Sequence, residues 1–293
     1  VLDLAEREVA ARLAEIEKGV HPCPKIDLPA AVDWVQKQLD MQLAEGQKQA
    51  FFGAFRHKVL VITGGPGVGK TTLIRSLVKV SAAKKLRLML CAPTGRAAKR
   101  MAELSGMEAK TIHRLLAFEP GTGKVRHDAR HPLETDVLIV DETSMIDVQL
   151  AVHLFRAMPR NGLLILVGDV DQLPSVGPGC VLRDVIESGT LPVYRLTEIF
   201  RQDAGSRSVR NAHRVNSGQM PELPGKDEGM AGGGDFFFVK AETPERGVEL
   251  IRKLVCEAIP RRFRFDPMND VQILTPMQKG ELGARNLNAA MQA

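Results

Sequence analysis

The sequence predicts an α/β protein in which a parallel sheet is covered by helices on both faces. Short apolar runs rich in Val, Ile and Leu recur along the chain, and helical stretches separate them. Strands joined through helices pair in parallel, and the crossing helices then cover the sheet. The 293 residues are 44% hydrophobic and 26% charged, a balance typical of globular proteins, so extended disorder and collagen are excluded.

Cysteine usage and hydropathy narrow the class further. The four cysteines lie singly, with no Cys-x-x-Cys spacing, so neither a zinc site nor a disulfide framework is indicated. No apolar run approaches the roughly 18 to 20 residues that span a bilayer, and no signal-peptide pattern opens the chain. We therefore expect a soluble protein of the reducing cytoplasm, with no membrane partner.

The predicted elements of the first part of the chain follow in order. Residues 3–18 place apolar side chains at near-helical spacing among charges, which predicts an amphipathic helix. A segment with three prolines ends this helix, and a second helix is expected at 31–43. Apolar runs typical of buried strands then occupy 58–63, 86–91, 137–140 and 163–167.

A loop rich in Gly and Pro at 218–234 separates this part from a second one. Beyond it, the pattern predicts a strand, a helix and a strand at 236–239, 244–259 and 271–275. We therefore expect an N-terminal helical segment, a first α/β domain with a small β-hairpin insertion, and part of a second α/β domain. Their expected bounds are 1–45, 46–200 with the insertion at 117–131, and 201–293.

Positive charge is concentrated between Lys84 and Arg130. This stretch holds eleven Lys and Arg against four acidic residues, a net charge of +7, whereas the whole chain carries +5. Two interpretations remain open: a surface that binds the phosphate backbone of a nucleic acid, or ordinary solvated helix faces.

The first predicted strand runs into a glycine-rich loop with the spacing G-x-x-x-x-G-K-[ST]. Glycines allow the backbone N–H groups of such a loop to turn inward around phosphate oxygens, and the following helix adds its positive end. Lys70 is expected to meet the β- and γ-phosphates, and the Thr71 hydroxyl to ligate Mg²⁺. The predicted nucleotide-binding residues are Gly64, Gly65, Pro66, Gly67, Val68, Gly69, Lys70, Thr71 and Thr72.

Two acidic residues, Asp141 and Glu142, directly follow the predicted strand at 137–140. A Mg²⁺-nucleotide site needs a carboxylate at a neighbouring strand end, so we expect Asp141 to hold the metal. Glu142 is then placed to accept a proton from the attacking water, which favours hydrolysis over group transfer. The chain has no Asn-Lys-x-Asp motif of the kind that reads guanine, so ATP and Mg²⁺ are the predicted ligands.

The strand at 163–167 ends in Gly-Asp-Val-Asp-Gln-Leu-Pro (168–174), whose polar groups suit a γ-phosphate sensor. Together with Asp-Glu-Thr-Ser-Met (141–145), it resembles motifs II and III of superfamily 1 DNA helicases of the RecD type, the exonuclease V alpha-subunit family. The resemblance extends over the whole chain and is closest to the stand-alone RecD-like helicases. It implies a RecA-like P-loop NTPase sheet followed by part of a second RecA-like domain.

Further segments match the family and receive roles from the resemblance alone. Gln47, within 45–50, matches the glutamine that reads adenine, and 196–202 matches motif IV, whose arginine reaches the γ-phosphate. Segments 274–280 and 287–288 resemble the opening of the second RecA-like domain. The catalytic residues implied in this way are Lys70, Glu142, Gln172 and Arg201.

The segments expected to contact DNA lie inside the basic stretch. Residues 92–100 match motif Ia, and 111–116 match the DNA-contact segment that follows it. Aromatic residues are only 4% of the chain, so we expect contacts to the backbone of single-stranded DNA with little base stacking. For His113, a DNA contact and a packed or capping histidine remain equally open. The predicted DNA-binding residues are Pro93, Thr94, Gly95, Arg96, Lys99, Thr111, His113 and Arg114.

Residues 118–128, with Gly-Thr-Gly at 121–123, carry a hairpin signal. In the family, a hairpin at this place, domain 1B, splits the duplex as a pin. A plain surface hairpin without that role is the alternative.

The combined hypothesis is an ATP-dependent DNA helicase or translocase whose 5′→3′ polarity follows from the resemblance alone. Its partners would be single-stranded and duplex DNA, and subunits that act in recombination and repair. Motifs V and VI of complete helicases are not found, so we expect Mg·ATP binding with little unwinding, and Val1 opens what resembles an internal helix. Two alternatives stay open: a scaffold subunit that binds DNA without hydrolysis, and the helicase-like part of a conjugative relaxase, although Tyr194 is the only tyrosine.

Overall fold

The computed structural model describes residues 2–198, 206–224 and 234–292. The chain divides into two compact units, Val1–Pro221 and Glu222–Ala293, and each is described by itself. The sequence placed this boundary after residue 200, but helix α10 (Arg207–Asn216) belongs to the first unit. Over the described ranges, no helix has the length and apolar character needed to cross a membrane.

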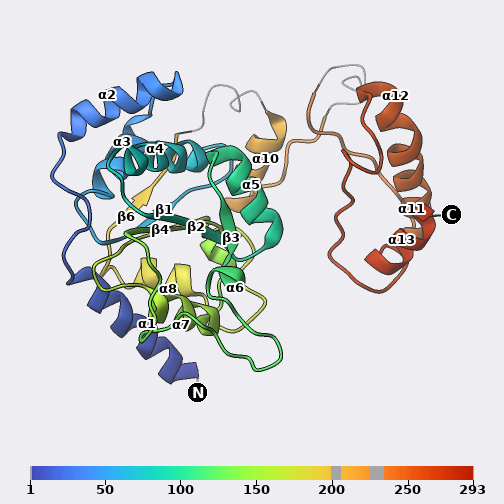
Figure 1. Cartoon of the computed structure of the whole chain (residues 1–293). Helices are drawn as coiled ribbons and strands as arrows, with labels where there is room; N and C mark the ends of the chain where they lie inside the picture. The colour runs from blue at the N-terminus through green and yellow to red at the C-terminus, as the bar shows by residue number, and fades with distance from the viewer. Residues whose placement is uncertain (1, 199–205, 225–233, 293) are drawn as a thin grey trace. The chain divides into compact units, whose positions relative to one another are not determined.

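The first unit is built on a sheet of six strands in the order β3-β2-β4-β5-β1-β6, and every pairing is parallel (Figure 1). The four apolar runs that predict strands all become strands at the centre of this sheet. The two strands that the sequence pattern misses, β3 and β6, have three residues each and lie at the edges. The bounds are β1 (Val59–Thr63), β2 (Leu88–Ala92), β3 (Ala109–Thr111), β4 (Val137–Val140), β5 (Leu163–Gly168) and β6 (Val193–Arg195).

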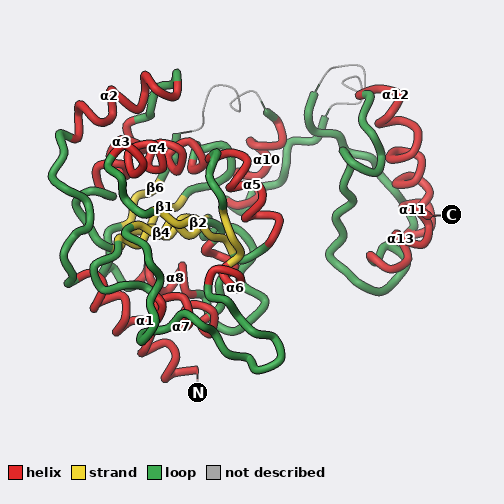
Figure 2. The backbone as a smooth tube through the Cα atoms, viewed as in Figure 1, coloured by secondary structure: helices red, strands yellow, loops and turns green. Residues whose placement is uncertain are grey.

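Helices cover both faces of the sheet, as predicted (Figure 2). Side chains alternate along β1, so that Val59 and Val61 enter one apolar core while Leu60 and Ile62 enter the other. The first core is closed by α1 (Leu2–Glu17), α6 (Ile112–Leu115), α7 (Val148–Ala157) and α8 (Val181–Glu187), and the second by α2 (Leu28–Leu39), α3 (Glu45–Gly53), α4 (Lys70–Ala83) and α5 (Gly95–Ser105).

The N-terminal helical segment is part of the first unit and does not stand apart from it. Val9, Leu13 and Ile16 of α1 are buried in the same core as α7. Arg156 of α7 forms an ion pair with Glu8 of α1 and donates hydrogen bonds to its carboxylate. This hydrogen bonding lowers the pKa of Glu8. Removing α1 would therefore expose one face of the core.

A buried lysine directly before β1 forms hydrogen bonds that hold the chain after α1 against the first unit. Lys58 is 4% exposed, and its Nζ donates to the carbonyl oxygens of Arg160 at 2.7 Å and Val20 at 3.2 Å. Glu17 accepts a hydrogen bond from the Val59 N–H at 2.7 Å. Burial lowers the pKa of Lys58 to about 8, against the opposing effect of Glu17.

The predicted hairpin is present only as a turn. Glu119 and Lys124 form an isolated antiparallel bridge, and the Gly123 N–H donates to the Glu119 carbonyl at 2.9 Å. Gly123 has φ +66°, a conformation that favours glycine. The return strand does not continue the ladder, because Arg126 N–H bonds instead to the Leu116 carbonyl at 3.0 Å.

In the second unit, the predicted helix is confirmed and the two predicted strands are wrong. One helical run comprises α11 (Pro244–Lys253), a π-helical turn (Leu254–Ala258) and α12 (Ile259–Phe263), and α13 (Ala284–Gln292) follows later. Segments 236–239 and 271–275 are extended without pairing to any described strand. An apolar run becomes a strand only where a partner supplies hydrogen bonds. Here the ring of Phe237 instead lies 5.5 Å from the Arg262 guanidinium.

The lowered pKa of Lys58 predicts how stability depends on pH. Between pH 8 and 10.5 the unfolded chain keeps the lysine proton while the folded chain releases it, so the free energy of unfolding should rise with pH. Denaturant unfolding across this range should show a steeper rise for the wild type than for Lys58→Met. Equal slopes in the two proteins would contradict the assignment.

Candidate functional site

Three of the four predicted catalytic residues, Lys70, Glu142 and Gln172, meet at the carboxyl edge of the sheet. Strands β4, β5 and β1 are neighbours, and Thr63 at the end of β1 pairs with Gly168 at the end of β5. The glycine-rich loop follows β1, Asp141 follows β4 and Asp169 follows β5. Parallel strands end at one edge, so three segments that are distant in sequence become neighbours there.

The loop after β1 has the backbone that its glycines predict. Gly67 and Gly69 have φ of +75° and +77°, in the left-handed region, and α4 begins at Lys70 directly after them. A Cβ on Gly64 would lie 2.5 Å from the Leu196 carbonyl oxygen, so no larger residue fits. The turn therefore delivers Lys70 and Thr71 at the N-terminus of a helix, where anions are favoured.

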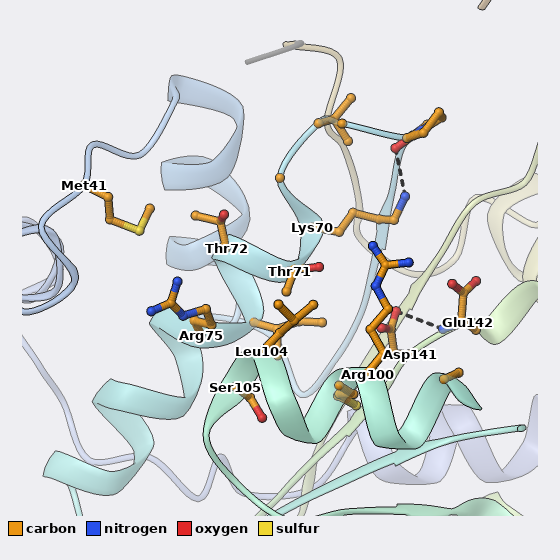
Figure 3. Close-up of a pocket in the computed structure, with 18 of the residues that line it drawn as sticks. Met41, Lys70, Thr71, Thr72, Arg75, Arg100, Leu104, Ser105, Asp141 and Glu142 are labelled. Carbon is orange, nitrogen blue, oxygen red and sulfur yellow. Dashed lines mark hydrogen bonds between the residues drawn. The ribbon is translucent and has the colours of Figure 1, made fainter. Parts of the chain in front are cut away.

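A cavity of about 950 Å³ opens over this loop (Figure 3). Figure 3 shows Lys70 and Thr71 at the start of α4 facing Asp141 and Glu142, with Arg100 of α5 alongside. The cavity brings together most of the residues predicted for the nucleotide. Its lining includes residues 65–72, Asp141, Glu142 and Gln172, and also Leu39, Met41, Gln42, Ile74, Arg75, Ala97, Arg100, Met101, Leu104 and Ser105.

Lys70 folds back onto its own loop. Its Nζ donates to the carbonyl oxygens of Gly64 and Gly65, the second at 2.9 Å. The ammonium group thus lies within the loop that would surround a phosphate chain, held by neutral acceptors that a phosphate can displace.

The acidic pair after β4 is held in a strained and partly buried position. Glu142 has φ +51°, uncommon for a residue with a side chain, and its N–H donates to Asp141 Oδ1 at 2.9 Å. Burial raises the pKa of Asp141, and burial together with the charge of Asp141 raises the pKa of Glu142. Lys70 and Arg100 oppose both shifts. A carboxylate with a raised pKa is a better proton acceptor, which suits Glu142 to general-base chemistry.

Thr143 fixes this turn to the sheet. It is fully buried, and its hydroxyl lies 3.1 Å from the Val140 carbonyl and 2.9 Å from the Val167 carbonyl. These two carbonyls belong to β4 and β5, so the hydroxyl ties both strand ends together below the acidic pair.

The oxygen-bearing side chains of the cavity suit a metal ion that binds together with a nucleotide. Within the described ranges, no group of three or more His, Cys, Asp or Glu could hold a metal ion. The Thr71 hydroxyl and the Asp141 carboxylate both line the cavity. Mg²⁺ in nucleotide sites takes one or two protein ligands and completes its shell with phosphate oxygens and water, so this pair fits it.

Gln47, which the family resemblance assigns to adenine, lies outside the lining of the cavity. It is 1% exposed. Its amide nitrogen donates to the Gly69 carbonyl at 3.0 Å, and its amide oxygen accepts from the Ala44 N–H at 2.9 Å. In this conformation Gln47 supports the end of the phosphate loop. Two other glutamines, Gln42 and Gln172, line the cavity.

The segment after β5 brings Gln172 to the cavity rim. Asp169 is 3% exposed; its carboxylate accepts from the Asp171 N–H at 3.1 Å, and its carbonyl from the Gln172 N–H at 3.3 Å. Gln172 is exposed and lines the same cavity as Glu142. Arg201, the predicted motif IV arginine, lies outside the described residues.

Sequence reasoning missed two arginines of the cavity, Arg75 and Arg100. Arg75 follows Thr71 by one helical turn, so helical spacing alone places it on the same face of α4. Arg100 belongs to the segment assigned to DNA, and its position toward the acidic pair depends on how α5 packs beside α4. Only the position of Arg75 could therefore have been predicted from the sequence, by its helical spacing from Thr71.

The predicted DNA segments follow β2 and β3, whose ends pair through Ala92 and Thr111. Thr94 and Thr111 cap the helices that begin there, each hydroxyl oxygen accepting a backbone N–H at 3.2 Å. Arg96 and Lys99 of α5 are exposed, and Lys99 forms an ion pair with Glu103 of the same helix at 3.9 Å.

His113 has an aromatic neighbour. Its ring lies 5.3 Å from the ring of Phe118 at an interplanar angle of 82°, an edge-to-face contact. The imidazole is nevertheless exposed, and it lines a shallow cavity of about 620 Å³ with Arg114, Phe118 and Pro120. Packing is therefore observed for His113, while its contact with DNA stays a prediction.

Comparisons with known proteins agree with this geometry. Residues 47–178 match a family described as AAA domain. The chain is 34% identical over 283 residues to the ATP-dependent RecD2 DNA helicase of Deinococcus radiodurans, covering 96% of this chain and 37% of that protein. It is 31% identical over 275 residues to the RecBCD enzyme subunit RecD of Mycobacterium tuberculosis, covering 84% and 43%.

Among solved structures, the Pif1 helicase from Candida albicans aligns with a TM-score of 0.49 and 26% identity, covering 62% of this chain and 46% of that chain. The chain spans 37% and 43% of the length of the two curated relatives named above. The sequence similarity and the site geometry together show that the chain belongs to the RecD-type family of superfamily 1 helicases.

Proposed function

We propose that this chain is the ATP-binding part of an ATP-dependent DNA helicase or translocase of the RecD type. The observation that supports it most is the convergence of Lys70, Thr71, Asp141, Glu142 and Gln172 on one cavity at the carboxyl edge of the sheet. The relative named as an ATP-dependent DNA helicase supports DNA as the substrate. The 5′→3′ polarity rests on the family resemblance alone.

In this proposal each residue acts on the triphosphate of ATP. Lys70 leaves the carbonyls of its loop and binds the β- and γ-phosphates, while Thr71 and Asp141 would hold Mg²⁺. The metal, when bound, neutralises charge that develops on the phosphate oxygens. Gln172 orients the attacking water and Glu142 accepts its proton. Arg201 is proposed to reach the γ-phosphate.

Helix α5 is proposed to link the nucleotide to DNA. Arg100 lines the nucleotide cavity, whereas Arg96 and Lys99 on the same helix are exposed. A change at the phosphates that moves α5 would therefore also move its exposed cations. We propose that these cations, with Thr111 and Arg114, bind the backbone of single-stranded DNA.

The proposed organisation follows the family. The first α/β domain holds the nucleotide and the turn at 117–131 is its 1B-like insertion. The second unit is part of a second RecA-like domain. The alternatives remain a DNA-binding scaffold without turnover and the helicase-like part of a conjugative relaxase. Stimulation of ATP hydrolysis by DNA separates the scaffold from the motor.

The central test is ATP hydrolysis with and without single-stranded DNA. We expect Mg²⁺-dependent ATPase activity that DNA stimulates. Lys70→Ala should lower it at least ~100-fold, since Lys70 stabilises charge in the transition state. Lys79→Ala, an exposed lysine on the same helix, is the matched control and should keep wild-type activity.

Two outcomes would decide against parts of this proposal. Nucleotide binding without hydrolysis, in the wild-type chain, would favour the scaffold. An unchanged rate in Lys70→Ala would remove the loop from the mechanism. Circular dichroism should show that both variants keep the wild-type helix content.

DNA binding through α5 should depend strongly on salt. Replacing Arg96 and Lys99 by Ala should weaken binding of single-stranded DNA for all sequences. The plot of the logarithm of the binding constant against the logarithm of the salt concentration should also become less steep, by about 1 to 2. Fluorescence anisotropy with labelled oligonucleotides at several salt concentrations measures both effects. Lys37→Ala on α2 is the control, and an equal loss of slope there would indicate only a nonspecific charge effect.

A further inference from the structure

A second cavity, of about 500 Å³, adjoins the nucleotide cavity. The two share Gly65, Pro66, Val68 and Gln172 as lining residues. Helix α10 contributes to the wall of the second cavity through His213, and none of the functions assigned above uses this helix. Thr63 of β1 also lines this cavity, as do Ala212 and Asn216 of α10.

Two polar atoms of this cavity are buried without a partner. Among the described residues, neither Thr63 Oγ1 nor His213 Nε2 has a hydrogen-bond partner, and both are shielded from solvent. Buried polar atoms in folded proteins are almost always paired. Two such atoms in one cavity indicate a site that acquires hydrogen bonds in another state of the protein.

The imidazole of His213 packs directly on the phosphate loop. A Cβ on Gly65 would lie 3.1 Å from His213 Cε1 and 3.7 Å from Nε2. The ammonium group of Lys70 donates hydrogen bonds to the carbonyl oxygens of Gly64 and Gly65. The unpartnered Nε2, which is a donor in one of the two neutral tautomers, therefore lies beside a residue whose carbonyl accepts from a group proposed to move.

We propose that His213 is a positioning residue of the nucleotide site. When Lys70 moves to the phosphates, the His213 Nε2–H replaces it as the donor to the Gly65 carbonyl. The loop then keeps a hydrogen-bonded backbone in its nucleotide-bound form. This inference rests on the proposed role of Lys70, because that role frees the carbonyl. It also connects the phosphate loop to α10, the last helix of the first unit.

Replacements at position 213 test this exchange through binding and stability together. His213→Phe fills the space without a donor, whereas His213→Gln keeps an N–H near the Nε2 position. Without ligand, the melting temperature of His213→Phe should equal or exceed that of the wild type, since Nε2 has no partner there. Its dissociation constant for Mg·ATPγS should rise about tenfold, the effect of one lost buried hydrogen bond.

The rescue and control variants complete the experiment. His213→Gln should bind Mg·ATPγS within about threefold of the wild type. Val215→Ala, 57% exposed on the same helix, should match the wild type. In ATPase assays, His213→Phe should raise KM with little change in kcat, because the hydrogen bond stabilises substrate and transition state alike.

The outcomes separate this inference from the proposed function. If the wild type binds Mg·ATPγS and His213→Phe binds equally well, the exchange does not occur. A lower melting temperature in His213→Phe without recovery in His213→Gln would show that the imidazole only fills space, which also overturns it. If the wild type itself fails to bind Mg·ATPγS, the proposed function is wrong, and the inference about His213, which rests on it, is wrong as well.

Discussion

Most of this site depends on one constraint, the parallel pairing of β1, β5 and β4. Parallel strands end on the same side of a sheet, so the segments that follow them must share that edge. The loop that ends in Lys70 and the pair that begins with Asp141 are separated by about seventy residues of sequence, yet they line one cavity. The hydroxyl of Thr143 strengthens the constraint, because it bonds to the Val140 carbonyl of β4 and to the Val167 carbonyl of β5.

The sequence predicts the interior of the first unit well because its signals are local and strong. Buried strands show as continuous apolar runs, and the glycine-rich loop requires residues without side chains at fixed positions. Edge strands β3 and β6 are short and half-buried, so no apolar run marks them. In the second unit, 236–239 and 271–275 have strand-like composition without a pairing partner, and composition cannot supply one.

Within the site, residue types that follow from chemistry were predictable, and positions that follow from packing were not. Asp141 and Glu142 could be assigned because a nucleotide-bound metal needs carboxylates at a strand end. Arg100 reaches the cavity only because α5 lies beside α4, which no spacing in the sequence encodes. Gln47 shows the opposite case: the family pattern assigns it to adenine, whereas its amide is occupied by Ala44 and Gly69 in this conformation.

The central claim is that Thr71 and Asp141 hold one metal ion together with the triphosphate, and binding of Mn²⁺ in place of Mg²⁺ tests it most directly. Electron paramagnetic resonance reports free Mn²⁺, which should fall on addition of the chain only when ATPγS is present. Thr71→Val and Asp141→Asn should each weaken this nucleotide-dependent binding. Wild-type Mn²⁺ binding in both variants would place the metal elsewhere and contradict the account.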